Sequence, residues 1–169
     1  MYVPLLEVLA HVLARRGRAC LRFNFRGVGR SSGSPTGGIQ ETEDVEGAFQ
    51  WLQEREDVDL GDLGVAGWSF GSWVGLRWAL SSGSCRRIAL VSPPLVGFDF
   101  FHFLDSENAH LCEQTLILSG ERDQFSDSSK LEELAQRLGA ELRILPDADH
   151  FLFGREKEIA EIVASHWSQ

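Results

Sequence analysis

The sequence lacks any apolar run approaching the roughly 20 residues that a transmembrane helix needs. It also lacks an excess of positive charge, because 25 acidic side chains outweigh 16 basic ones and give a net charge of −9. Nucleic acids and anionic membranes both favour a basic protein face, so we exclude them as main partners. The first residues carry no basic group ahead of their apolar stretch, and Glu7 interrupts that stretch. We therefore predict no signal peptide.

Cysteine is scarce, since only Cys20, Cys85 and Cys112 occur, scattered along the chain. Three unclustered thiols favour reduced cysteines in a cytoplasmic protein over a disulfide framework or a metal site. We accordingly predict no bound metal and no cofactor. The chain has 169 residues, of which 43% are hydrophobic and 24% charged, and it shows neither repeats nor low-complexity linkers. These features predict a single globular domain, 1–169.

Hydrophobic periodicity and turn residues predict that strands alternate with helices. The expected helices cover residues 4–16, 39–55, 70–80, 128–138 and 155–167. The expected strands cover residues 19–25, 63–66, 87–92, 115–119 and 142–145. Most of these strands are short and continuously apolar, so we predict an α/β three-layer sandwich with a mostly parallel sheet of about five strands. The ligand site of such a sheet lies at the carboxyl ends of its strands.

The segment Gly67-Trp68-Ser69-Phe70-Gly71 stands between a predicted strand and a predicted helix. A serine on such a tight turn is lifted above the sheet, and the helix N-terminus behind it favours developing negative charge. We expect both glycines to be needed, because side chains there would clash. Ser69 is therefore the candidate nucleophile, and the neighbouring Trp68 and Phe70 are candidate substrate contacts. The alternative is an ordinary glycine-rich turn.

A second segment, Gly29-Arg30-Ser31-Ser32-Gly33, matches the same pattern, but loop residues follow it rather than a helix. We therefore prefer Ser69 to Ser31 as the nucleophile. Gly27-Val28-Gly29 after a strand also suggests nucleotide binding. The third glycine of that fingerprint is missing, with Ser32 in its place, and no helix opens there, so we exclude this function.

An acid and a histidine follow two later predicted strands. Asp123 can orient a histidine and stabilise its charged form, and Asp127 is its nearest competitor. His150 follows the last strand and can take the proton of the serine and later donate it to a leaving group. We expect the adjacent Asp147 and Asp149 to shape the turn.

These motifs resemble those of the α/β-hydrolase superfamily, and more narrowly the small lidless bacterial-type hydrolases related to dienelactone hydrolases and serine aminopeptidase-like esterases. The resembling segments span nearly the whole chain: Leu21–Ser31, Gly67–Gly71, Gly120–Asp123 and Asp149–Phe151. The order serine, aspartate, histidine is also that of the superfamily. The resemblance implies a small-molecule acyl substrate and hydrolysis of an ester, thioester or amide through an acyl-enzyme, with Ser69, Asp123 and His150 as the catalytic triad.

The chain also departs from this family. Family members begin with further strands and a His- and Gly-rich loop that donates one oxyanion-hole N–H, and one of those strands lies between the equivalents of 19–25 and 63–66. The backbone N–H of Phe70 remains as one oxyanion donor, and the second has no visible source. Either the chain is a fragment, or the two flanking strands pair directly, or another chain fills the gap, which leaves a homo-oligomer open. The alternative function is a catalytically weak or inactive binding domain.

One aromatic segment is left, with Phe98, Phe100, Phe101 and Phe103 after the strand at 87–92. These rings could line an acyl pocket or form a small cap over the site. They could equally pack into the core, and we favour core packing.

Overall fold

The computed structural model describes residues 3–106 and 109–168. The elements follow in the order α1 (Pro4–Arg15), α2 (Glu41–Gln53), the 3-10 helix η1 (Leu60–Asp62), β1 (Gly64–Trp68), α3 (Phe70–Ser82), β2 (Arg87–Val91), β3 (Gln114–Gly120), α4 (Ser128–Leu138), β4 (Glu141–Leu145) and α5 (Glu156–His166). The chain divides into two compact units. One unit holds the residues up to Gly61 together with those from Glu156, and the other holds residues 62–155.

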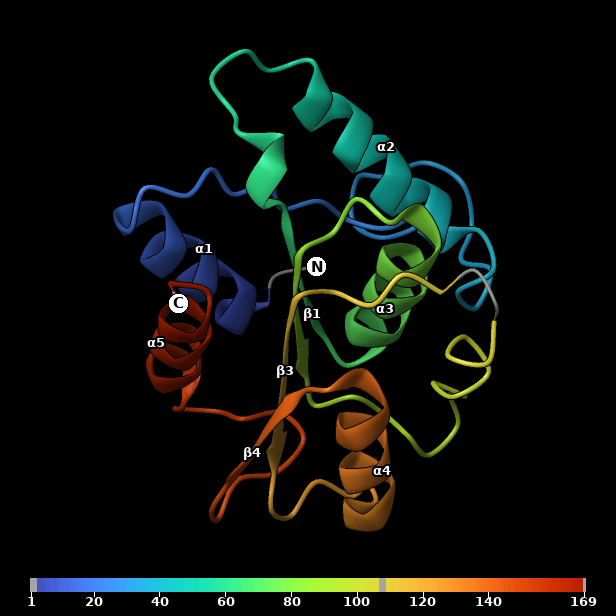
Figure 1. Cartoon of the computed structure of the whole chain (residues 1–169), viewed down its shortest axis with the longest axis vertical. Coiled ribbons are helices and arrows are strands. Elements are labelled where there is room, and N and C mark those ends of the chain that lie inside the picture. Colours follow the sequence, from blue (N-terminus) through green and yellow to red (C-terminus); the bar gives the residue numbers. More distant parts are fainter. Residues whose placement is uncertain (1–2, 107–108, 169) are drawn as a thin grey trace. The chain divides into compact units, whose positions relative to one another are not determined.

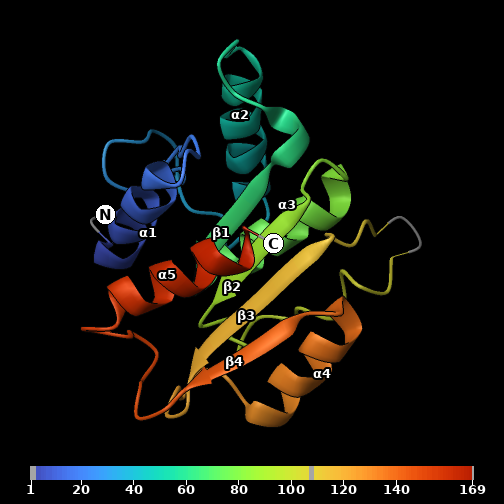
Figure 2. The ribbon, with the colours of Figure 1, turned by 60° about the vertical axis from the view of Figure 1, so that its left-hand side comes forward.

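The unit of residues 62–155 contains a four-stranded parallel sheet in the order β1-β2-β3-β4 (Figure 2). The central strands β2 and β3 are buried along almost their whole length, which explains why their sequences are apolar without alternation. The edge strand β4 instead exposes Arg143 and Ile144. This parallel sheet with its helices confirms the predicted α/β class.

Helices α3 and α4 lie on the same side of this sheet (Figure 1). Capping residues mark the start of α4 and the ends of both helices. Helix α4 begins after Asp127, whose side chain accepts the backbone N–H of Lys130. Gly83 and Gly139 follow α3 and α4 in the left-handed conformation, with φ of 64° and 61°. The predicted bounds of these helices are therefore close to those observed.

In the other unit, α1 and α5 pack side by side (Figures 1 and 2). Both helices bury one apolar face, and an ion pair of 2.6 Å joins Arg16 to Glu161. The loop before α2 is organised by the buried Glu41, which accepts hydrogen bonds from the Thr36 N–H (2.7 Å), the Thr36 hydroxyl (2.6 Å) and the Gly38 N–H (2.7 Å). Burial would raise the pKa of Glu41, but these bonds outweigh it and lower the pKa to about 2.

The predicted strand over residues 19–25 is wrong, and the sheet has four strands where about five were expected. The apolar and aromatic residues there do favour an extended chain, but a strand forms only where a partner completes its hydrogen-bond ladder. In residues 3–106 and 109–168, no strand pairs with this segment. The chain is held locally instead, by bonds from the Arg26 N–H to Asp44 (2.8 Å) and from the Ser31 hydroxyl to the Asn24 carbonyl (2.9 Å).

Within the described residues, no helix is long and apolar enough to cross a membrane. Over the same residues, no group of three or more His, Cys, Asp or Glu side chains is arranged to hold a metal ion. The three cysteines are free thiols, with Cys85 buried and Cys20 exposed.

Candidate active site

Ser69 occupies the sharp turn that joins β1 to α3. Its φ of 52° and ψ of −122° are unusual for a residue with a side chain, and its N–H donates to the Val91 carbonyl at 2.8 Å. A Cβ on Gly67 would lie 2.2 Å from the backbone oxygen of Gly71, so only glycine fits at position 67. A Cβ on Gly71 would meet no atom within 4 Å. The prediction that side chains would clash at both glycines is therefore wrong at Gly71.

The structure brings Ser69, His150 and Asp123 together in one chain of hydrogen bonds. The Nε2 atom of His150 lies 2.8 Å from Ser69 Oγ, and its Nδ1 atom lies 3.0 and 2.9 Å from the two carboxylate oxygens of Asp123. The residues follow the carboxyl ends of β1, β4 and β3, the edge where a parallel sheet places its ligands. In this geometry Nε2 can accept the serine proton while Asp123 holds the opposite nitrogen.

Asp123 is buried at 6% exposure, and burial by itself would raise the pKa of its carboxyl group. The hydrogen bonds from His150 and from the Phe125 N–H (2.9 Å) outweigh burial and bring the pKa below its ordinary value. The group is therefore a carboxylate at neutral pH. The competing Asp127 instead caps α4 and accepts the Ser129 hydroxyl at 2.5 Å.

Gly120, at the end of β3, is a positioning residue that sequence reasoning missed. A Cβ there would lie 2.3 Å from the backbone oxygen of Ala148, so glycine lets the loop before His150 lie directly against the strand end. Two backbone bonds join the same segments, from the Arg122 N–H to the Ala148 carbonyl and from the Glu121 N–H to the Leu145 carbonyl, both at 2.9 Å. The sequence signal for this role is a glycine placed between a predicted strand and a candidate catalytic acid.

Trp68, a candidate substrate contact, binds the loop of the candidate base. Its indole Nε1 donates to the backbone carbonyl of His150 at 3.2 Å, and the two rings are 5.7 Å apart. The carboxylate of Asp149 accepts the N–H groups of Phe151 and Leu152 at 3.0 and 3.1 Å, so Asp149 shapes the turn after the histidine.

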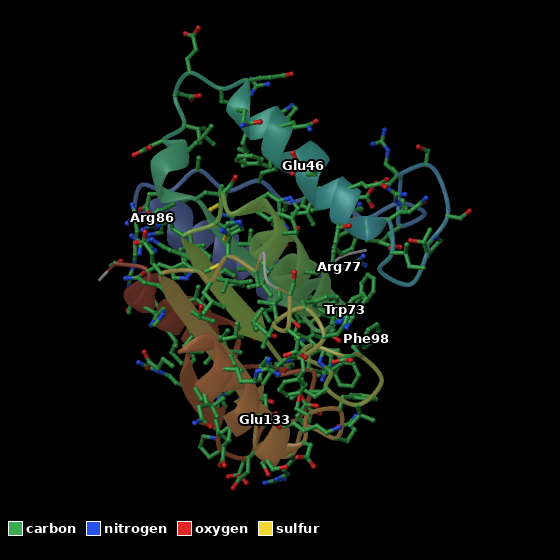
Figure 3. The ribbon with its side chains drawn as sticks, turned by 45° about the vertical axis from the view of Figure 1, so that its right-hand side comes forward. Glu46, Trp73, Arg77, Arg86, Phe98 and Glu133 are labelled. Atoms are coloured by element: carbon green, nitrogen blue, oxygen red, sulfur yellow. The ribbon has the colours of Figure 1, made fainter. Side chains whose placement is uncertain are left out.

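Phe70 is the first residue of α3, so its backbone N–H lies at the positive end of the helix dipole. The N–H groups of this first turn have no acceptor within the helix. Its ring lies 5.7 Å from that of Phe98 and 6.2 Å from that of Trp73. Figure 3 shows Phe98 beside Trp73, and their ring centroids are 5.1 Å apart. Of the aromatic segment, Phe100 is fully buried in the core as favoured above, whereas Phe98 and Phe103 pack on Trp73.

Ser31, the rejected nucleophile candidate, donates its hydroxyl to a backbone carbonyl and has no helix behind it. The geometry therefore separates the two serine motifs in the manner that their local sequence predicts.

Comparison with known proteins adds an independent result. The family model of the alpha/beta hydrolase fold matches residues 5–111. The protein RP471 of Rickettsia prowazekii (strain Madrid E) is 28% identical over 160 residues, which cover 90% of this chain and 66% of that protein. The chain thus spans slightly less than two thirds of the length of this relative.

Two solved structures extend the comparison. An alpha-beta serine hydrolase homologue from Coxiella burnetii matches with a TM-score of 0.83 and 26% identity, covering 98% of this chain and 76% of the other. XC6422 from Xanthomonas campestris, a member of the a/b serine hydrolases without a lid, matches with a TM-score of 0.82 and 28% identity, covering 98% and 73%. Because the family model spans more than half of the chain, this protein belongs to the alpha/beta hydrolase fold family.

Proposed function

We propose that this chain is a serine hydrolase that cleaves an ester, thioester or amide through an acyl-enzyme. The observation that carries the proposal is the hydrogen-bond chain from Ser69 Oγ through His150 to Asp123, with contacts of 2.8 and 2.9 Å. Nucleophile, base and orienting acid are the three groups that such a reaction requires. Ser69 Oγ and the Asp123 carboxylate each lie within hydrogen-bond distance of a nitrogen of His150.

The first half of the reaction forms the acyl-enzyme. Ser69 Oγ attacks the substrate carbonyl carbon while its proton moves to His150 Nε2, and the Asp123 carboxylate stabilises the resulting imidazolium. The backbone N–H of Phe70 donates to the oxyanion at the start of α3. The intermediate then collapses, the bond to the leaving group breaks, and Nε2 gives its proton to that group.

The second half regenerates the enzyme. Water loses a proton to His150 Nε2 and attacks the acyl carbon, and the bond to Ser69 Oγ breaks. The carboxylic acid leaves and the proton returns to the serine. No cofactor enters either half of this sequence.

The experiment is labelling with a fluorophosphonate probe, combined with turnover of p-nitrophenyl acetate. We expect stoichiometric labelling at Ser69, and a loss of at least about 10³-fold in kcat/KM for Ser69→Ala. Ser31→Ala is the matched control, because Ser31 lies in the same five-residue pattern without the strand-to-helix turn, and it should label and turn over normally. A folded wild-type chain that neither labels nor turns over ester would refute the proposal in favour of a binding domain.

A further inference from the structure

Three aromatic rings surround the imidazole of His150. The ring centroid of Phe125 lies 4.7 Å from that of His150, Phe151 lies 5.6 Å away and Trp68 lies 5.7 Å away. We call these three residues the aromatic collar. Phe125 and Phe151 remain 39% and 45% exposed, although each could gain stability by burial. Apolar rings left in solvent at one place commonly mark a binding surface.

The turn after the histidine holds Phe151 outward. The carboxylate of Asp149 accepts the N–H groups of Phe151 and Leu152, and Leu152 has a φ of 55° with its side chain 1% exposed. This buried leucine anchors the turn, so the phenylalanines on either side of it face solvent. Phe153 stacks on Phe151 with an interplanar angle of 10° and continues the apolar row. The collar is therefore shaped before a ligand arrives, which lowers the cost of binding.

The proposed reaction determines which half of the substrate meets the collar. When the acyl-enzyme forms, His150 Nε2 donates its proton to the leaving oxygen, so that oxygen must lie within hydrogen-bond reach of Nε2. The group attached to that oxygen then lies close to the imidazole, whose centroid is 4.7 to 5.7 Å from the centroids of the three collar rings. The acyl carbon is bonded instead to Ser69 Oγ.

We infer that the aromatic collar is a leaving-group subsite that selects esters of uncharged aromatic alcohols, an inference that rests on the proposed function. Phe125 and Phe151 already meet His150 at 71° and 87°, the edge-to-face geometry that aromatic pairs prefer, while Trp68 is tilted by 41°. A substrate ring can join the two phenylalanines in the same edge-to-face way. The exposed phenylalanine rings of the collar are apolar, so they favour an uncharged alcohol over an ionic one.

The test measures binding without turnover. The full-length Ser69→Ala variant is titrated with benzyl, cyclohexylmethyl and ethyl acetate, and the Trp68 indole signal is followed by NMR. We expect benzyl acetate to bind about two- to tenfold more tightly than cyclohexylmethyl acetate, which has a similar size but no π-system. Adding Phe151→Ala should weaken benzyl acetate binding by a similar factor. Phe151→Leu, which keeps an apolar side chain in place, should reduce the difference in affinity between benzyl and cyclohexylmethyl acetate without abolishing it, because Phe125 and Trp68 remain.

Phe23→Ala is the matched control, because Phe23 is also 45% exposed, belongs to the other unit and packs on Phe25. It should leave the affinities unchanged. Equal affinities for benzyl and cyclohexylmethyl acetate, or no effect of Phe151→Ala, would overturn the inference. Ring-selective binding by a chain that neither labels nor turns over would refute the hydrolase and leave the subsite standing. Turnover of ester without a preference for aromatic rings would support the hydrolase and refute the leaving-group subsite.

Discussion

Replacing Gly120 with alanine tests whether the contact at the end of β3 holds the His150 loop in place. The added Cβ would lie 2.3 Å from the Ala148 oxygen and 2.7 Å from the Asp149 oxygen, whereas real Cβ contacts essentially never fall below 3.0 Å. Both oxygens belong to the backbone, so they cannot rotate away as a flexible side chain can. The loop must therefore shift, by roughly 0.7 Å or more at Ala148.

The expected loss of activity follows from the position of His150, which lies in the loop that must shift. His150 follows Asp149 directly, and its Nε2 lies 2.8 Å from Ser69 Oγ. A misplacement of about 1 Å in a catalytic group costs on the order of 10²-fold in rate, so we expect Gly120→Ala to lower kcat/KM by about 10- to 100-fold. Overpacking typically costs about 1–3 kcal/mol, which lowers Tm by roughly 3–10 °C in a chain of this size.

The assay compares the rate of fluorophosphonate labelling, the turnover of p-nitrophenyl acetate and Tm for Gly120→Ala and Gly47→Ala. Gly47 lies in α2, and a Cβ there would meet no atom within 4 Å. That control should keep full activity and gain up to about 1 kcal/mol from better helix propensity. A Gly120→Ala variant equal to wild type in both labelling rate and Tm would show that the contact does not position the loop.

Three further predictions concern carboxylates. Asp123→Asn should lower kcat by about 10³- to 10⁴-fold with little change in KM, because the amide no longer holds the histidine in its productive tautomer. Asp127→Ala should instead cost about 1 kcal/mol of stability through loss of a helix cap and leave kcat unchanged, and the reverse pattern would exchange the two roles. Glu41 has a pKa of about 2 against an ordinary 4.5, so its carboxylate stabilises the fold above about pH 4.5 and this contribution is lost as the pH falls toward 2. Glu41→Gln should therefore lower stability by about 1–3 kcal/mol at pH 7 and by roughly half of that or less at pH 3, as measured by urea denaturation, and an equal loss at both pH values would contradict this assignment.

Much of the candidate site could be predicted from local sequence. The sequence distinguishes Ser69 from Ser31 because a predicted strand precedes Ser69 and a predicted helix follows it, and both elements exist. His150 stands out for a similar reason, because it is the histidine that follows the last strand. Asp123 and Asp127 both follow the same strand, and the local sequence does not show the path of the loop between them.

The sequence by itself determined the helices, the strands from β1 onward and the turn that carries Ser69, because periodicity, caps and turn residues act within a few positions of the chain. The tertiary structure alone decided that residues 19–25 pair with no strand in the described chain, that the Asp123 carboxylate comes within 2.9 Å of His150 Nδ1, and that Gly120 must lack a side chain. Each depends on partners well separated along the chain, 27 positions in the case of Asp123 and His150. The parallel pairing of β3 with β4 brings such partners together, because it places side by side two segments that a whole helix separates along the chain.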